Sequence, residues 1–161
     1  MFIIEKLVTH TSKRQQAIRA VANIELLVQP EDGWTEQTLA EMLAQESMHM
    51  LIVYKQEEKE GNKVIGYCLY QMLFEQAEIL RIGTHPDYQR QGIASQLFAT
   101  LNSELMNNNV ESLLLEVRAD NAPAIALYKQ QNFAVIHKRK GYYQVPHQPA
   151  LDALIMQRVY D

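Results

Sequence analysis

The sequence predicts an α/β (α+β) fold in which helices cover both faces of a mixed central sheet of about six to seven strands. Three observations support this class. Apolar, strand-like runs alternate with helical patterns in the centre of the chain. Two strand-like runs near residue 60 are joined by a short charged connection, which is typical of an antiparallel hairpin. The consecutive leucines Leu113-Leu114-Leu115 indicate a strand that is covered on both faces.

The length of 161 residues and the lack of a low-complexity tract predict one domain over residues 1–161. A chain of this length can bury about 70% of the surface that it exposes when unfolded, so it needs no disulfide. Cys68 is the only cysteine, and no basic segment followed by a long apolar one begins the chain. These features predict a reducing cytoplasm as the compartment. No run reaches the length of a membrane span, so we expect no membrane partner.

The charge balance argues against nucleic acid as a direct partner. The formal net charge is −4 and the sequence pI is about 5.7, so the chain does not attract phosphate backbones without sequence preference. An acidic surface favours a basic partner instead. The five histidines show neither His-x-x-x-His spacing nor pairing with a cysteine, and we therefore expect no metal site.

The first part of the chain is predicted to contain one strand and two helices. An apolar run over residues 2–8 predicts the strand, and a serine cap with an apolar stripe predicts a helix over residues 12–27. A polar segment with proline and glycine ends that helix. Thr35 is the predicted cap of a second helix that runs to about residue 46, because Trp34 stands where a hydrophobic staple begins.

The middle of the chain is predicted to be a hairpin, a further strand and a long helix. Residues 50–55 and 63–73 are the hairpin strands, and residues 77–84 form the next strand. A helix follows from Gly92 to the asparagine triplet 107–109, which can adopt the left-handed conformation found after many helices. Its apolar residues recur at every fourth position, at Ile93, Leu97, Leu101 and Leu105.

The last part of the chain is predicted to alternate strand, helix, strand and strand. Residues 110–117 form a buried strand, and Pro123 stands in the first turn of the helix that follows, where its missing N–H does least harm. Residues 133–140 and 151–159 are the remaining strands. Asn132 ends the helix, and asparagine accepts a positive φ there.

The loop before the helix at Gly92 is a candidate anion site. Gln89-Arg90-Gln91-Gly92-Ile93-Ala94 connects a strand to a helix whose first N–H groups have no partner in the helix. Those N–H groups and the helix dipole can bind a pyrophosphate without a side-chain cation, and Gly92 allows a sharp turn or a close approach. The alternative is a turn that only connects strand to helix.

Two residues, Glu116 and Tyr128, are candidates for proton transfer. Glu116 interrupts an apolar strand, and a carboxylate in such a place must be paired, protonated or used in chemistry. Its alternative role is an ion pair with Arg118 or another basic side chain. Tyr128 lies on a helical stripe, where an aromatic residue usually belongs to the core. Cys68 has no neighbouring base and is expected to be buried and inert, and His85 is expected to be a loop residue.

These motifs resemble those of a known enzyme family. Gln89, Gly92 and Ala94 fit the pattern Gln/Arg-x-x-Gly-x-Gly/Ala, which resembles the coenzyme A pyrophosphate loop of the GCN5-related N-acetyltransferases (GNAT). The segment LEVRADNAPAIALY and the later tyrosine pair extend the resemblance, over about residues 82–156, to bacterial ribosomal-protein-alanine N-acetyltransferases of the RimI type. In those relatives a glycine occupies the position of Ala94, and a glycine is also usual at the position of Asn132.

The resemblance implies the GNAT fold, acetyl-CoA as co-substrate and no metal. It assigns the general base to Glu116 and the general acid to Tyr128. It places the coenzyme contacts on ten residues: Ile82, Gly83, Thr84, Arg90, Gln91, Gly92, Ile93, Ala94, Ser95 and Asn121. It also implies an aromatic clamp for the acceptor, formed by Trp34, Tyr142 and Tyr143; the alternative is that these side chains only close the sheet edge.

The implied activity is direct transfer of an acetyl group, in a ternary complex, to a protein N-terminal amine. The implied acceptor is the N-terminal alanine of a small-subunit ribosomal protein. Two alternatives remain open at this point. One is a GNAT enzyme that acetylates lysine side chains or a small-molecule amine, and the other is a non-catalytic module that binds coenzyme A or a partner. The presence of both Glu116 and Tyr128 favours an enzyme.

Overall fold

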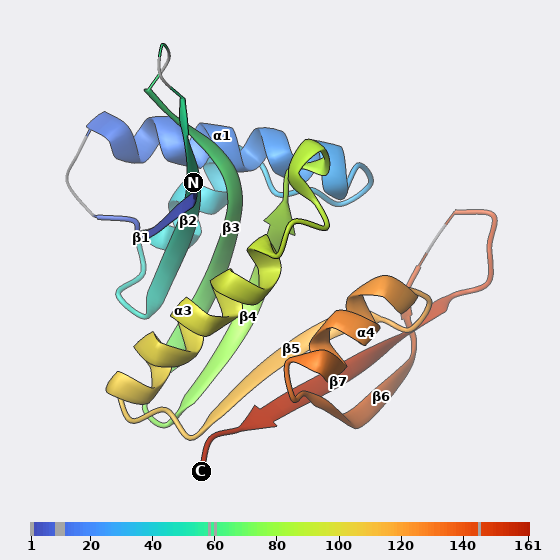
Figure 1. Cartoon of the computed structure of the whole chain (residues 1–161). Coiled ribbons are helices and arrows are strands. Elements are labelled where there is room, and N and C mark those ends of the chain that lie inside the picture. The colour runs from blue at the N-terminus through green and yellow to red at the C-terminus, as the bar shows by residue number, and fades with distance from the viewer. Residues whose placement is uncertain (1, 9–11, 58, 60, 145) are drawn as a thin grey trace.

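A computed structural model describes residues 2–8, 12–57, 59, 61–144 and 146–161. Over these residues the chain forms seven strands, four α-helices and one short 3₁₀ helix (Figure 1). The strands are β1 Phe2–Lys6, β2 Met48–Glu57, β3 Gly61–Leu73, β4 Gln76–Thr84, β5 Ser112–Arg118, β6 Ala134–Tyr143 and β7 Leu151–Val159. The helices are α1 Ser12–Val28, α2 Glu36–Leu43, α3 Ile93–Asn107 and α4 Ala122–Gln130, with η1 at Pro86–Tyr88.

The strands form one mixed sheet in the order β1-β2-β3-β4-β5-β7-β6. Strands β1 to β4 pair antiparallel with their neighbours, and β7 pairs antiparallel with both β5 and β6. The parallel contact is between β4 and β5, which the α3 segment connects. This arrangement confirms the predicted mixed sheet.

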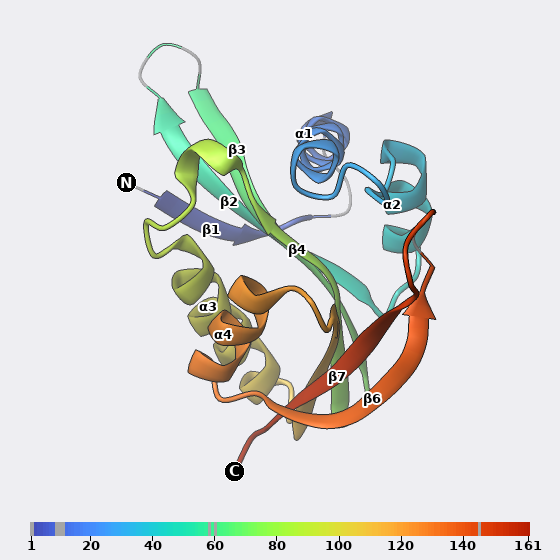
Figure 2. The same ribbon diagram turned by 90° about the vertical axis from the view of Figure 1, so that its right-hand side faces the viewer.

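Helices cover both faces of the sheet, as expected (Figure 2). Helices α1 and α2 pack on one face, where buried residues such as Val21, Leu39 and Met50 form one apolar cluster. Helices α3 and α4 pack on the other face, over a larger cluster that includes Leu101 and Phe98. The two clusters stabilise the sheet from both sides, because each removes apolar surface from water.

The predicted helix boundaries hold closely at most ends. Helix α1 ends at Val28, one residue beyond the prediction. Thr35 caps α2 as predicted, since its hydroxyl accepts the N–H of Thr38 at 3.1 Å. The left-handed conformations expected after α3 and α4 are present, at Asn109 with φ 59° and Asn132 with φ 67°.

Some predicted boundaries were wrong by two or three residues. Strand β1 ends at Lys6, and α2 ends at Leu43, because a turn leads into β2, which starts at position 48. Strand β6 continues to Tyr143, three residues beyond the predicted end. It does so because Tyr143 pairs with Leu151 and the N–H of Gly141 donates to the Asp152 carboxylate at 2.9 Å.

The pairing of β4 with β5 stops early, and this creates a gap in the sheet. The two strands pair over Gln76–Ile79 and Ser112–Leu115. Beyond that point β4 pairs with β3 alone, and β5 pairs with β7 alone. A bulge in β4 places Leu69 opposite Arg81 and Tyr70 opposite Ile79, so Leu80 is the extra residue. Because of this bulge, Leu80 and Arg81 both face the side of the sheet that carries α1.

Candidate active site

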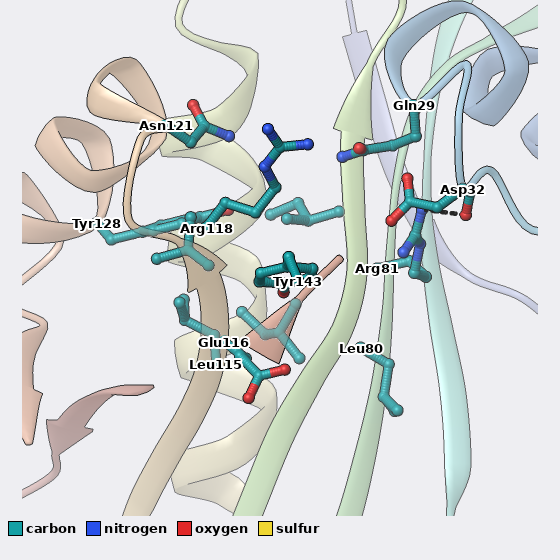
Figure 3. Close-up of a pocket in the computed structure, with 13 residues that line it drawn as sticks. Gln29, Asp32, Leu80, Arg81, Leu115, Glu116, Arg118, Asn121, Tyr128 and Tyr143 are labelled. Carbon is teal, nitrogen blue, oxygen red and sulfur yellow. Dashed lines mark hydrogen bonds between the residues drawn. The ribbon is translucent and has the colours of Figure 1, made fainter. Parts of the chain in front are cut away.

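The gap between β4 and β5 contains a cavity of about 110 Å³. Its lining comes from β4, β5, α4, β6 and the segment between α1 and α2. Figure 3 shows Glu116 and Tyr128 on the β5 and α4 side of this cavity, with Arg81 and Asp32 across it. The structure therefore brings the two proposed proton-transfer residues to one cavity.

Glu116 is held at the cavity by an ion pair. Its Oε1 lies 3.2 Å from Nη1 of Arg139 on β6, and its side chain is 27% exposed. Arg118, which the sequence suggested as a partner, pairs instead with Asp120 at 2.9 Å. Glu116 is thus ion-paired and also lines the cavity. Arg139 can orient its carboxylate while that carboxylate stays accessible to a substrate in the cavity.

Tyr128 belongs both to the core and to the cavity. The residue is 8% exposed, and its ring packs edge-on against Phe98, with centroids 6.1 Å apart, and lies 6.0 Å from Phe133. It also lines the cavity. Burial raises the pKa of Tyr128 to about 12, because the phenolate would be poorly solvated. The phenol is therefore a neutral hydrogen-bond donor at ordinary pH.

The predicted anion loop has the backbone of a helix-terminal binding site. Gly92 precedes α3 with φ +80°, and the carbonyl of Gly92 accepts the N–H of Gln96 at 3.1 Å, the first bond of the helix. Arg90 also has a positive φ, 63°. A Cβ at position 92 would meet no atom within 4 Å, so the left-handed conformation is what favours glycine there. Three N–H groups precede the helical bonds, those of Ile93, Ala94 and Ser95.

Side chains tie this loop to the end of β4. The amide of Gln89 donates to the carbonyl of Thr84 at 3.1 Å, and the amide of Gln91 donates to the carbonyl of Asp87 at 3.5 Å. The first bond holds the loop beside the end of β4, and the second lies within the connection, since Asp87 belongs to η1.

The other predicted coenzyme residues lie at the end of β4 and at the start of α4. Ile82, Gly83 and Thr84 form the last part of β4, where the strand no longer pairs with β5. Asn121 caps α4 on the opposite side, and its side chain accepts the N–H of Ala124 at 3.3 Å. Ile82 and Asn121 both line the cavity.

The three aromatic residues predicted to bind the acceptor have different positions. Tyr143 lines the cavity. Tyr142 packs edge-on against it, with centroids 5.3 Å apart, and lies beneath the guanidinium of Arg139 at 4.8 Å. Trp34 packs against the guanidinium of Arg81, 5.2 Å from its ring centroid. Neither Trp34 nor Tyr142 is among the residues of the lining; Trp34 contacts the cavity wall through Arg81, and Tyr142 contacts it through Tyr143.

Sequence reasoning missed the two arginines and a buried glutamate. Arg81 and Arg139 lie within predicted strands, and the structure shows that each contacts a carboxylate at the cavity or beside it. Glu25 is completely buried on α1. A signal for Glu25 was present, because it interrupts the apolar run Ile24 to Val28 as Glu116 interrupts its strand.

Cys68 is buried and free, and burial raises the pKa of its thiol, as expected for an inert cysteine. Within the part of the chain that the structure describes, no group of three or more His, Cys, Asp or Glu side chains is placed to hold a metal ion. No helix among the described residues is long and apolar enough to cross a membrane.

A family model for GNAT acetyltransferases matches residues 18–133. The match includes most of α1, the bulged strand β4, the loop at Gly92 and α4 with Tyr128. The chain belongs to the GNAT acetyltransferase family. This confirms the predicted fold and identifies the chain as an acyltransferase.

Two kinds of N-acetyltransferase are among the proteins similar in sequence. The [ribosomal protein bS18]-alanine N-acetyltransferase of Escherichia coli (strain K12) is 34% identical over 110 residues, which cover 68% of this chain and 70% of that protein. An N-alpha-acetyltransferase of Saccharolobus solfataricus is 35% identical over 95 residues, 51% of this chain and 57% of that protein.

Solved structures agree with the sequence comparison. The crystal structure of the ribosomal-protein-S18-alanine N-acetyltransferase from Escherichia coli superposes with a TM-score of 0.79 at 28% identity, covering 99% of this chain and 94% of that one. The structure of Arabidopsis thaliana NAA60 in complex with acetyl-CoA has a TM-score of 0.82 at 15% identity, covering 99% and 98%, and supports the fold alone. The resemblance to the RimI type is therefore confirmed.

Proposed function

We propose that this GNAT enzyme transfers the acetyl group of acetyl-CoA to the α-amino group of a protein N-terminus, and that its acceptor is the N-terminal alanine of a small-subunit ribosomal protein. The observation that carries the proposal is that Glu116 and Tyr128 both line the cavity in the gap between β4 and β5. Relatives at 34% identity are named for alanine N-acetylation of ribosomal protein bS18.

The coenzyme is proposed to lie along β4. Its pyrophosphate accepts hydrogen bonds from N–H groups at the start of α3, just after Arg90 and Gly92, which adopt left-handed conformations. Residues 82–84 and Asn121 contact the arm that leads to the cavity, and the thioester reaches the cavity between β4 and β5. The unpaired side of β4 offers backbone N–H groups near the thioester carbonyl, and such groups stabilise a developing oxyanion.

Proton transfer and stabilisation of the leaving group are assigned to the two side chains at the cavity. An α-amino group has a pKa of about 8, so roughly a tenth of it is neutral near pH 7. Glu116 takes the proton from the remainder, directly or through a water. The thiolate of coenzyme A leaves as the amide forms, and the neutral phenol of Tyr128 donates a hydrogen bond to it. Because burial raises the pKa of Tyr128 to about 12, above the value of about 8.5 for a thiol, Tyr128 stabilises the thiolate through this hydrogen bond and keeps its proton.

A panel of acceptors tests the proposal. The purified protein is incubated with acetyl-CoA and with a peptide that has the N-terminal sequence of a small-subunit ribosomal protein beginning with alanine. The same peptide with a blocked N-terminus, a lysine-containing peptide and a polyamine serve as comparisons, and mass spectrometry locates the acetyl group. Acetylation of the free alanine N-terminus alone is the expected result.

Two outcomes would overturn the proposal. Transfer to lysine or polyamine without transfer to the alanine peptide would make the chain a different kind of GNAT enzyme. Coenzyme binding with no turnover on any acceptor would make it a non-catalytic binding module. In cells, mass spectrometry of ribosomal protein N-termini with and without the gene identifies the natural acceptor.

A further inference from the structure

A charged group is completely buried beside the cavity. Glu25 on α1 has no exposed surface, and its carboxylate accepts three hydrogen bonds. The donors are the hydroxyl of Tyr67, Nε of Arg81 at 2.6 Å and the backbone N–H of Trp34 at 3.1 Å. A carboxylate removed from water needs such partners, because its unpaired charge would be strongly destabilising.

Arg81 connects three parts of the molecule. It lies on β4 at the bulge, its side chain is 14% exposed, and it lines the cavity. Besides Glu25, its guanidinium donates through Nη2 to the backbone carbonyl of Asp32 at 3.3 Å and packs against the ring of Trp34 at 5.2 Å. A planar guanidinium can make these contacts at once in only a narrow range of orientations.

The contacts of Arg81 hold the segment between α1 and α2, residues 29–35, in place. Gln29 and Asp32 of this segment line the cavity opposite Glu116 (Figure 3). At Gly33 the chain passes so close to the end of α1 that a Cβ would lie 3.0 Å from the carbonyl oxygen of Glu25. The segment is therefore pressed against α1 at Gly33 and fastened to β4 by Arg81.

We propose that Arg81 is a positioning residue for the acceptor. By pairing with Glu25 and with the carbonyl of Asp32, it fixes segment 29–35 against β4 and so sets the wall of the cavity that the amine acceptor meets. The inference rests on the proposed function, in which the acceptor enters this cavity. Within the described residues, the hydrogen bonds of Arg81 and its contact with Trp34 are to α1 and to segment 29–35, so we expect its loss to change the acceptor wall more than coenzyme binding.

Steady-state kinetics of R81Q and R81K test the role. For R81Q we expect the KM for the alanine peptide to rise about tenfold or more, since a misplacement of about 1 Å can cost about 10²-fold. The KM for acetyl-CoA should stay within about twofold of the wild-type value. R81K keeps the charge beside Glu25 but loses the planar fork, so it should recover part of the acceptor affinity.

The matched control is R19Q. Arg19 on α1 pairs with Glu36 of α2 at 3.3 Å, but both side chains are exposed. This pair also bridges the two elements around segment 29–35, yet an exposed ion pair contributes little. R19Q should therefore leave both KM values unchanged. If R19Q raises the acceptor KM as much as R81Q does, or if R81Q raises both KM values equally, the proposal is wrong.

A structural readout keeps the test independent of catalysis. Trp34 is the only tryptophan of the chain, so its fluorescence reports on segment 29–35. R81Q should increase quenching of Trp34 by acrylamide and speed hydrogen exchange at residues 29–35, without change at the start of α3. Unchanged quenching and exchange would overturn the proposal. Because these measurements need no acceptor, they still decide it if the wild-type protein acetylates no peptide and the proposed function fails.

E25Q covers the case in which R81Q does not fold. A glutamine at position 25 can still accept the N–H of Trp34 through its amide oxygen and can donate from its amide nitrogen to the hydroxyl oxygen of Tyr67, but it removes the ionic partner of Arg81. We expect the same rise in acceptor KM and in Trp34 quenching, at a smaller magnitude. A folded E25Q protein with wild-type values for both would contradict the role.

Discussion

Among single residues, the surroundings of Glu116 explain how a carboxylate can be available for chemistry inside a sheet. Arg139 pairs with it at 3.2 Å from β6, and the same guanidinium lies over Tyr142. The pair orients the carboxylate without removing it from the cavity. Nearby, burial and the charge of Glu116 raise the pKa of Glu78, which places a second, more weakly acidic carboxyl group on the neighbouring strand.

Glu116→Gln should lower turnover by about 10²-fold or more, because general-base catalysis contributes about 10²–10⁴-fold. Turnover should also shift toward higher pH, where more of the acceptor amine is already neutral. Coenzyme affinity, measured by calorimetry, should change little. Glu104→Gln is the matched control, because Glu104 has a similar exposure of 29% and one ion pair, to Lys6 at 2.9 Å, but lies on α3. Kinetics equal to those of the control would remove Glu116 from its role.

Tyr128→Phe should slow turnover by about 10–10²-fold and leave stability nearly unchanged, because the ring keeps its contacts with Phe98 and Phe133. The pH profile adds a second check. The pKa of Tyr128 is raised to about 12, so the phenol remains protonated below that value. Wild-type turnover should therefore show no loss from phenol ionisation between pH 7 and 10. A wild-type rate for the variant would assign Tyr128 to the core alone.

Among the elements, the β4–loop–α3 unit is the one on which the proposed coenzyme site depends. The bulge at Leu80 turns Arg81 toward α1, while the rest of β4 continues to the loop. The loop then reverses direction through two left-handed residues, Arg90 and Gly92. A short stretch of chain thus positions an acceptor wall at one end and a helix N-terminus at the other.

Gly92→Val should weaken acetyl-CoA binding about tenfold or more, because a β-branched residue is strained at φ +80° and the loop would change its path. Equilibrium dialysis or calorimetry measures the effect. Gly61→Val is the matched control: Gly61 has φ +77°, its Cβ would also meet no atom within 4 Å, and it lies in the β2–β3 hairpin. Both variants should lose similar stability, but only the first should lose coenzyme affinity. Equal affinities would contradict the assignment of the loop.

In the whole molecule, the site exists because the two halves of the sheet diverge. Strands β1 to β4 form one half of the sheet, and β5, β7 and β6 form the other. β5 stops pairing with β4 after Leu115 but continues to pair with β7 as far as Arg118. The cluster beneath α3 and α4 spans this division, since it contains residues of both halves together with Tyr128. The same cluster therefore stabilises the fold and supports the cavity.

Phe98→Ala should lower the free energy of unfolding by about 3–5 kcal/mol, because a fully buried aromatic ring is removed and leaves a cavity. It should also lower turnover of the folded protein, since Phe98 supports the ring of Tyr128. Urea unfolding followed by circular dichroism measures the first effect. Phe74→Ala is the control, because Phe74 is 91% exposed and should change stability by less than about 0.5 kcal/mol. Similar losses for both would show that the α3 side is not the principal core.

The sequence predicted much of this structure where local patterns decide it. The cap at Thr35, the apolar stripe of α3 and the asparagines at helix ends are determined by residues within a few positions of one another. The loop before α3, with Gly92, is likewise determined by residues close together in the sequence. The candidate site residues Glu116 and Tyr128 were recognised because a carboxylate in an apolar strand is unusual and because the motif around them resembles a known family.

Contacts between distant segments were beyond such patterns. Arg81 and Glu25 are 56 positions apart, and only the folded chain brings the guanidinium of one to the buried carboxylate of the other. The extension of β6 to Tyr143 likewise depends on pairing with β7. Local sequence sets which backbone conformations are low in energy, whereas desolvation forces buried charges to find partners anywhere in the chain. The sequence by itself therefore determined the helices and strands and the candidate residues Glu116 and Tyr128. Packing between distant segments determined which residues form the walls of the cavity.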